Sequence, residues 1–496
     1  MLMKLNVIFK SDKLLVILSA ILYSIPYINF DLYILHWFFL LPILYLIEFK
    51  NTNIIFTGLL FGVTSSFIGQ YWITETLMNI AGVSFSNGIL IHTIYSLYES
   101  IFFIIIFFII KKIFSEKKFY IIKFLILIFA WICIENIFPR IFPYKLGNSQ
   151  INFKYLSPLI GFFGINIISF FVLALNITLH FIYRRRNIFK YYKLYPLIFL
   201  IFFLGIKKEH SEENYKSYEK SSIKIVQPNN EKNNLRLYSA TPVLDYKIYD
   251  LTIWPESSMD FIDLDNIDQV ERFRKDFKTN YPFNSKELIF GTITKRNDNF
   301  YNSAILINKN NDFKNFKNKK KLLIYGEYYP FKEIISKLIP IYKNYRDLMP
   351  GKNKPIKLQN ESSVFIFICY EDLFADDLAN IVSDNDIGYL INITNDIWYG
   401  NSIAAYQHLM LSLPRAIEAN KFLVRSANNG ISAVISPKGK IIKKIDLNNE
   451  GSIFYEIPII KKKTIYHSYY KIIETSYYLI LILLVFIKKI FYTREN

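Results

Sequence analysis

The sequence predicts a bundle of membrane-spanning helices that carries a soluble α/β domain. Three observations predict this fold class. Hydrophobic residues make up 52% of the chain, with 45 Phe and 37 Tyr among the aromatic residues, which is typical of a membrane protein. Long apolar runs lie mostly in the first half of the chain, and one more lies near the C-terminus. Between them is a more polar block in which short β-rich runs alternate with helix-like stretches.

The apolar runs are the first element to justify. A helix needs roughly 20 mostly apolar residues to cross ~30 Å of hydrocarbon, and eight segments approach or exceed this length. We expect the first of them to be retained as a helix, because further spans follow it and no small-residue cleavage site does. The expected spans are 13–29, 33–49, 53–73, 87–110, 119–138, 156–183, 191–206 and 472–487.

The formal net charge of +18 is compatible with binding either nucleic acid or an anionic lipid surface. The basic residues flank the apolar spans, so we expect a lipid bilayer as a partner and no nucleic acid. They gather in alternate loops, which the positive-inside rule assigns to the cytoplasm. Both termini are then expected in the cytoplasm and the polar block on the opposite face, although Lys207 and Lys208 depart from the rule. The basic loop positions are Lys4, Lys10, Lys13, Lys50, 111–118, 184–193, Lys488 and Lys489.

The polar block is expected at 207–470, between the transmembrane region at 1–206 and a C-terminal helix with its tail at 471–496. Its β-rich runs and the helix-like stretch 406–420 predict an α/β layer domain of ordinary size. The Lys- and Asn-rich segment 309–318 is expected to be a loop. The β-rich runs are 222–227, 249–254, 287–294, 303–308, 363–368 and 388–394.

The chain has two cysteines, and only one of them lies in the polar block. Cys133 belongs to an apolar span, so we expect no disulfide and a free thiol at Cys369. Cys369 stands where the apolar run VFIFI gives way to the helix-like stretch EDLFADDLANIV. A nucleophile at such a turn is held rigidly, and a helix N-terminus stabilises its thiolate. From this stretch alone, a buried structural cysteine is the favoured alternative.

Two further motifs bring charged side chains to strand ends. Trp254-Pro255-Glu256 closes a strand, and a partly desolvated Glu256 is suited to act as general base for a thiol. The run Lys319-Lys320-Lys321 precedes the segment LLIYGEY, and a lysine beside a reacting carbonyl stabilises an oxyanion. Taken singly, a surface glutamate and a solvated lysine face are the ordinary alternatives.

The order of these motifs along the chain is more specific than any one of them. This order resembles that of the nitrilase superfamily, whose sites use Glu, Lys and Cys on an αββα sandwich. The motifs follow one another as WPE, then the lysine with GEY, then ICYE. The segments NITNDIWYG (392–400) and YQHLMLSLPRAIEANKFLVRSANNGISAVISPKGKI (406–441) strengthen the resemblance. With helices before and after the domain, and with VQPN (226–229), YNSAILI (301–307) and FPYKLGNSQ (142–150), the whole chain resembles the apolipoprotein N-acyltransferases.

The resemblance implies an eight-helix bundle that carries a nitrilase-like αββα domain, and it implies roles for individual residues. Glu256 would be the general base, Lys319 the oxyanion-stabilising cation and Cys369 the nucleophile. The lysine depends on register, because Lys320 and Lys321 follow directly. No metal and no cofactor are implied. The supporting residues implied are Glu327, Tyr370 and Glu371.

The implied reaction is a ping-pong acyl transfer. A fatty acyl chain passes from a membrane phospholipid to a thioester on Cys369, and then to the α-amine of the S-diacylglyceryl-cysteine that begins an apolipoprotein. A multi-pass protein of the bacterial inner membrane, monomeric and with its catalytic domain in the periplasm, is expected. The aromatic stretch 328–342 is either a lid or ordinary packing, and His92 and Glu99 are expected to pack between helices.

Two alternatives stay open. A membrane-tethered nitrilase-type amidase would use the same three residues to hydrolyse a small amide, and the helical frame and the downstream segments argue against it. A non-catalytic relative is suggested by the shortened segment between Gln227 and Trp254, which has no counterpart to the family's tryptophan after VQ. The proline usual before GEY is Ile324 here. Retention of all three reactive residue types in register argues against this second alternative.

Overall fold

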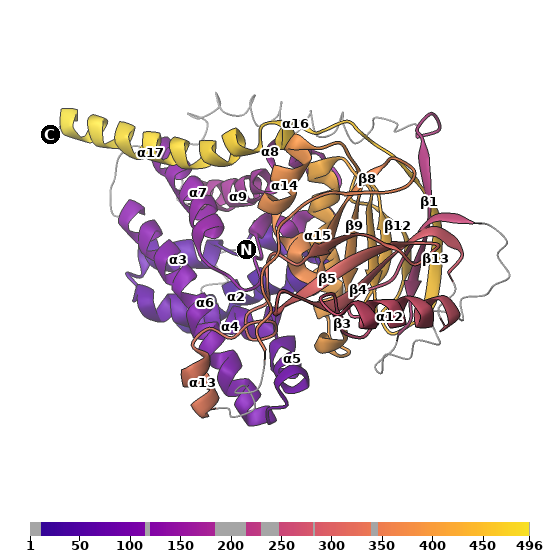
Figure 1. Ribbon diagram of the computed structural model, residues 1–496. Helices are drawn as coiled ribbons and strands as arrows, with labels where there is room; N and C mark the ends of the chain where they lie inside the picture. Colours follow the sequence, from indigo (N-terminus) through magenta and orange to yellow (C-terminus); the bar gives the residue numbers. More distant parts are fainter. Residues whose placement is uncertain are drawn as a thin grey trace. The chain divides into compact units, whose positions relative to one another are not determined.

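The structure, a computed structural model, describes residues 11–114, 120–183, 215–229, 248–280, 283–338 and 346–495. The chain divides into a helical unit, Met1–Ser211 with Ser468–Asn496, and an α/β unit, Glu212–His467. In Figure 1 the helical unit is drawn from indigo to purple and ends in the yellow helix α17 (Tyr470–Glu495), while both sheets belong to the α/β unit.

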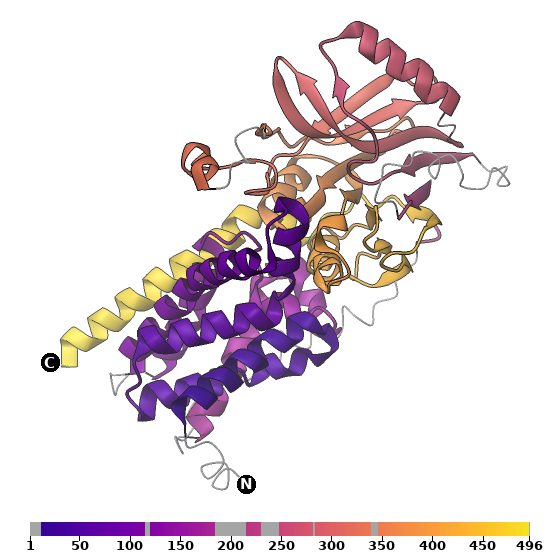
Figure 2. The ribbon, with the colours of Figure 1, turned by 90° about the horizontal axis from the view of Figure 1, so that it is seen from below.

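In its described residues, the helical unit consists of α-helices joined by turns and 3-10 segments. Figure 2 shows its long helices running side by side, with α17 lying along α7. The elements before α17 are α2 (Asp12–Ile28), η1 (Phe30–Trp37), α3 (Leu41–Phe49), α4 (Ile54–Gly69), α5 (Trp72–Ala81), α6 (Phe85–Phe114), α7 (Tyr120–Ile137), η2 (Leu146–Gln150), η3 (Ser157–Leu159), α8 (Ile160–Phe163) and α9 (Asn166–Tyr183).

Four described helices are long and apolar enough to cross a membrane, or five if the bent pair α4 and α5 counts as one span. The expected count of eight is therefore not confirmed. Helix α2 has only 17 residues, and the expected span 156–183 is divided because Gly164 (φ 73°) ends α8 before α9 begins. The expected span 191–206 lies outside the described residues. The four are Phe30–Phe49, Phe85–Phe114, Asn166–Tyr183 and Tyr470–Ile490.

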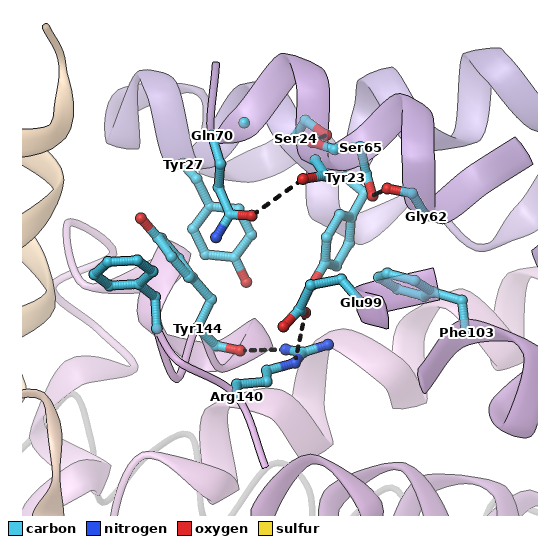
Figure 3. Close-up of a pocket in the computed structure, with 13 residues that line it drawn as sticks. Tyr23, Ser24, Tyr27, Gly62, Ser65, Gln70, Glu99, Phe103, Arg140 and Tyr144 are labelled. Carbon is cyan, nitrogen blue, oxygen red and sulfur yellow. Dashed lines mark hydrogen bonds and ion pairs between the residues drawn. The ribbon is translucent and has the colours of Figure 1, made fainter. Parts of the chain in front are cut away.

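A small cavity of about 40 Å³ lies inside the helical unit. Glu99 of α6 faces Arg140 there, with 3.1 Å between Oε2 and Nε, and the Arg140 Nη1 donates to the Tyr144 carbonyl at 2.8 Å. Figure 3 shows the rings of Tyr23 and Tyr27 beside this ion pair. Buried charges are costly unless they are paired. The contacts agree with the expectation that Glu99 packs between helices.

The described part of the α/β unit contains two stacked sheets. The first has seven strands in the order β13-β1-β2-β4-β5-β6, with β3 paired to β4, and the second has six in the order β12-β11-β10-β9-β8-β7. The strands are β1 (Lys220–Gln227), β2 (Tyr249–Ile253), β3 (Ile262–Asp263), β4 (Ser285–Arg296), β5 (Asn299–Asn308), β6 (Phe313–Asn318), β7 (Ile356–Lys357), β8 (Ser363–Ile368), β9 (Ile387–Thr394), β10 (Leu423–Ala427), β11 (Ser432–Ile435), β12 (Ile441–Ile445) and β13 (Gly451–Pro458).

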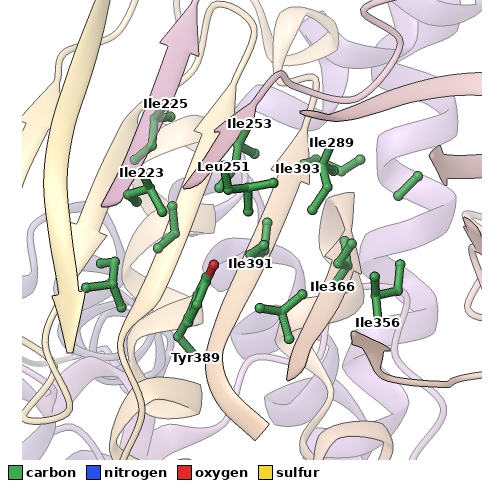
Figure 4. Packing of buried hydrophobic residues seen from close by; sticks show 14 of the residues in the cluster. Ile223, Ile225, Leu251, Ile253, Ile289, Ile356, Ile366, Tyr389, Ile391 and Ile393 are labelled. Carbon is green, nitrogen blue, oxygen red and sulfur yellow. The ribbon is translucent and has the colours of Figure 1, made fainter. Parts of the chain in front are cut away.

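The core lies between the sheets because alternate residues of each strand point inward. Figure 4 shows Ile223 and Ile225 of β1 in the same buried cluster as Ile391 and Ile393 of β9. On the outer face of the first sheet, Phe277 of α12 (Ile267–Asn280) packs against a second buried cluster. Helix α15 (Ala404–Ala419) contacts β10 of the second sheet and packs on α14 (Ala375–Asp384). These layers confirm the predicted αββα sandwich.

The six predicted strands are all present, as β1, β2, β4, β5, β8 and β9, and the predicted helix is α15. The prediction of a loop at 309–318 was wrong over Phe313–Asn318, which forms β6 and pairs antiparallel with β5. Phe313 and Phe316 pack against the buried cluster beside α12, while Lys314 between them suits an edge strand. The two cysteines are free, as expected.

Candidate active site

Cys369 lies at a sharp turn where β8 ends. It begins the 3-10 segment η6 (Cys369–Leu373), and α14 follows at Ala375. Its φ of 54° is left-handed, a conformation that costs free energy in a residue with a side chain and is found most often at functional sites. The Asn392 side chain donates to the Cys369 carbonyl at 2.8 Å. The turn thus holds a cysteine that is 8% exposed at the end of a buried strand.

Glu256 follows β2 and is almost fully buried. Its Oε1 accepts a hydrogen bond from Asn302 Nδ2 at 2.7 Å, and its Oε2 accepts one from the Asn395 backbone N–H at 2.9 Å. The neighbouring strand comes very close, since a Cβ on Gly291 would lie 2.5 Å from the Glu256 Cα. Only glycine at position 291 permits this backbone approach.

Lys319 follows β6 and is 1% exposed. Its Nζ lies 2.9 Å from Glu327 Oε1 and 3.6 Å from Glu256 Oε1. The next two lysines turn away from these glutamates, because Lys320 pairs with Asp377 at 2.5 Å and Lys321 with Asp376 at 3.2 Å. Of the three lysines, the structure brings Lys319 to the glutamates.

Asn302 of β5 connects these groups, although it was not among the residues expected from the sequence. Its Nδ2 donates to Glu256 and to Glu327, both at 2.7 Å, and its backbone carbonyl accepts from the Lys319 N–H at 2.7 Å. It occupies a buried position on a strand whose buried residues are mostly apolar. A polar residue at such a position is the one signal in the sequence that points to it.

Two of the expected supporting residues tie the lysine segment to the turn at Cys369. Glu371 accepts from the Ile368 N–H at 2.9 Å and the Lys320 N–H at 2.7 Å, and it pairs with the buried Lys317. The Tyr370 hydroxyl donates to the Leu322 carbonyl at 2.7 Å. The segment that carries Lys319 is thereby held against the turn that carries the thiol.

The electrostatics keep the thiol protonated at rest. Burial, and then the charge of Glu256, raise the pKa of Cys369 well above its usual 9.0. Burial lowers the pKa of Lys319, but Glu327, Cys369 and Glu256 together raise it well above 10.5. Burial also raises the pKa of Glu256 above its usual 4.5, against the opposing charge of Lys319. The thiol therefore needs a base at the moment of attack, which is the role that the resemblance implies for Glu256.

Two models of known protein families match this chain, one in the helical unit and one in the α/β unit. A family model described as the apolipoprotein N-acyltransferase N-terminal domain matches residues 19–178, and one described as carbon-nitrogen hydrolase matches residues 284–461. The chain belongs to the apolipoprotein N-acyltransferase family. Lys319 and Cys369 fall inside the carbon-nitrogen hydrolase match, and Glu256 lies before its start.

Relatives in the apolipoprotein N-acyltransferase family match at moderate identity. The apolipoprotein N-acyltransferase of Wigglesworthia glossinidia brevipalpis is 29% identical over 417 residues, which cover 78% of this chain and 80% of that protein. The apolipoprotein N-acyltransferase of Rickettsia prowazekii is 36% identical over 224 residues, which cover 42% of each chain. A solved CN-hydrolase superfamily protein from Xanthomonas campestris is 15% identical, covering 48% of this chain and 91% of its own, with a TM-score of 0.34.

Within the described ranges, no group of three or more His, Cys, Asp or Glu side chains is arranged to hold a metal ion. The chemistry that this arrangement offers is that of one thiol, one buried carboxylate and one buried ammonium group. A carboxylate that accepts a proton, beside a cation that stabilises an oxyanion, suits nucleophilic acyl transfer.

Proposed function

We propose that this chain transfers a fatty acyl chain from a membrane phospholipid to the α-amino group of the N-terminal S-diacylglyceryl-cysteine of apolipoproteins. The observation that carries the proposal is the buried grouping of Glu256 and Lys319 beside Cys369 in a chain of this family. It is supported by the N-terminal match, since residues 19–178 match a model described as the apolipoprotein N-acyltransferase N-terminal domain.

In the first half-reaction, Glu256 takes the proton from the Cys369 thiol, and the sulfur attacks the ester carbonyl of the phospholipid. The Lys319 ammonium group donates to the oxyanion of the tetrahedral intermediate. The carbon–oxygen ester bond then breaks, and Glu256 returns the proton to the leaving alkoxide, which departs as a lysophospholipid. A carboxyl whose pKa lies above its usual value suits both transfers. The fatty acyl chain remains as a thioester on Cys369.

In the second half-reaction, the neutral α-amine of the diacylglyceryl-cysteine attacks the thioester carbon. Glu256 takes a proton from the amine, Lys319 again stabilises the oxyanion, and the carbon–sulfur bond breaks. The proton on Glu256 passes to the Cys369 sulfur, which restores the thiol, and the product is an amide. Water competes with the amine for a thioester, so the burial of all three side chains favours transfer over hydrolysis.

The proposed location is the bacterial inner membrane, with the catalytic unit in the periplasm, both termini in the cytoplasm and the protein acting as a monomer. Among the described residues, four or five helices long enough to cross a bilayer support the membrane location. The basic residues Lys111 and Lys112 at the end of α6 support the orientation.

Acyl transfer is tested by supplying purified protein in phospholipid bilayers with a diacylated lipopeptide whose N-terminal amine is free. The proposal expects an N-acylated lipopeptide and a lysophospholipid in equal amounts, and neither with the Cys369→Ala variant. Hydrolysis of small amides without N-acylated lipopeptide would instead establish the amidase alternative.

A further inference from the structure

A cluster of buried charges lies behind the turn at Cys369, and none of its members belongs to the set proposed above. Asp372 and Arg425 are fully buried, as is Asp396, and His408 is 4% exposed. They come from four segments, namely η6, the turn after β9, α15 and β10. We call these four residues the buried charge cluster. Charges without contact to water are kept in a fold only with close partners.

One chain of hydrogen bonds, which we call the Asn392 arm, connects this cluster to the nucleophile Cys369. Arg425 Nη1 donates to Asp372 Oδ2 at 3.1 Å and to Asn392 Oδ1 at 3.2 Å. The Nδ2 of the same Asn392 donates to the carbonyl of Cys369 at 2.8 Å. Arg425 therefore orients the amide that holds the carbonyl of a residue in left-handed conformation.

A second arm reaches the base. Arg425 Nη2 donates to Asp396 Oδ2 at 3.0 Å. Asn395, the residue before Asp396, donates a hydrogen bond from its backbone N–H to Glu256 Oε2 at 2.9 Å. The loop at Gly430 closes against the Asp396 carboxylate, because a Cβ at position 430 would collide with Asp396 Oδ2. A shift of Asp396 would thus move the donor that orients Glu256.

The His408 ring lies between Asp372 and Asp396 and contacts both. Its Nε2 lies 3.2 Å from Asp372 Oδ1 and its Nδ1 lies 3.0 Å from Asp396 Oδ1. The guanidinium of Arg425 also faces this ring, with Nη2 2.9 Å from Nδ1, and the Tyr399 ring meets it edge-on. The planar fork of an arginine reaches several partners at fixed angles, which a lysine does not.

We propose that Arg425 is a positioning residue, which sets the placement of Cys369 relative to Glu256 through the Asn392 and Asn395 arms. The consequence for acyl transfer rests on the proposed function, but the consequence for the reactivity of the thiol does not. Loss of either set of hydrogen bonds leaves Cys369 and Glu256 in the site but changes their relative position. A misplacement of about 1 Å lowers a reaction rate by ~100-fold.

The test measures alkylation of Cys369 by iodoacetamide across a pH series in the full-length protein, with mass spectrometry to locate the adduct. We expect Arg425→Lys to slow alkylation at Cys369 by at least ~10-fold. The matched control is Arg415→Lys on α15, a buried arginine that pairs with Glu418 at 2.9 Å. We expect this control to react at the wild-type rate.

Two variants of Asn392 keep the inference testable if Arg425→Lys does not fold. Asn392→Ala and Asn392→Asp both lose the donor to the Cys369 carbonyl, but only the second adds a charge. Equal slowing in both supports the positioning role. Slowing in Asn392→Asp alone, or alkylation of all these variants at the wild-type rate with only a lower melting temperature, overturns it. If alkylation depends on Arg425 and no acyl-enzyme ever forms, the proposed function fails and the positioning role stands.

Discussion

Replacing Asn302 by aspartate changes the hydrogen bonding of both glutamates with almost no change in shape. In the native protein the Asn302 Nδ2 donates to Glu256 and to Glu327, each at 2.7 Å. An ionised aspartate donates to neither and adds a third carboxylate beside Lys319. A protonated aspartate restores one donor, so at least one hydrogen bond to a charged group is lost in either state.

The size of the effect follows from that count. One hydrogen bond to a charged group contributes about 1.5–3 kcal/mol. At about 1.36 kcal/mol for each tenfold change, the loss amounts to a rate about 10- to 150-fold lower. Because a low pH protonates the new aspartate and restores a donor, we expect the loss for Asn302→Asp to be larger at pH ~8 than at pH ~6.

The assay is the rate of acyl-enzyme formation, followed by intact-protein mass spectrometry in phospholipid bilayers. Asn308→Asp is the matched control, since Asn308 lies on the same strand and contacts Asp312 at 3.2 Å instead of the glutamates. Wild-type rates in Asn302→Asp, or equal losses in the two variants, would refute the reasoning.

Three other changes probe separate regions of the site. Lys319→Ala is expected to slow acyl-enzyme formation at least ~100-fold in a single-turnover assay, while Lys320→Ala leaves the rate unchanged; the reverse order would contradict the lysine assignment. Burial and Arg425 lower the pKa of His408, but the two aspartates of the buried charge cluster raise it above 6.5 overall. Protonated His408 therefore contributes its whole stabilisation below pH 6.5, and this stabilisation is lost as the pH rises through the pKa of His408 in the folded protein. We expect the melting temperature of His408→Gln to fall less than that of the wild type as the pH rises above 6.5. Gly291→Ala forces a Cβ to 2.5 Å from the Glu256 Cα, and we expect a lower melting temperature together with slower acylation, whereas a wild-type rate would show that the backbone approach is not needed.

The positions of Cys369 and Glu256 at strand ends were predictable from a local pattern, whereas their roles were implied by the order of the motifs and the family resemblance. Cys369 and Glu256 each follow a buried apolar strand, and the strands themselves have the alternation and composition of sheet residues. The lysine register was assigned to Lys319 only through the family resemblance, because it depends on β6, whose Lys- and Asn-rich sequence is typical of a loop. Only its pairing with β5 makes that segment a strand and fixes Lys319 at its end.

The connecting residues escaped prediction for a different reason. Asn302 meets Glu256 across 46 positions of the chain, and Arg425 meets Asp372 across 53. No local pattern records such contacts, which arise only when the strands are stacked. In the helical unit, the hydropathy pattern also did not predict the end of α8 at Gly164. The apolar run has the same hydropathy whether or not one glycine turns the backbone.

The most direct measurement of the proposed acyl-enzyme is peptide mass spectrometry of the full-length protein after incubation with phospholipid bilayers. We predict a fatty acyl adduct on Cys369 in the wild type, no adduct in Cys369→Ala, and loss of the adduct when a diacylated lipopeptide is added. A wild-type protein that stays folded yet carries no acyl group on Cys369, or carries it on another residue, would contradict the proposed mechanism.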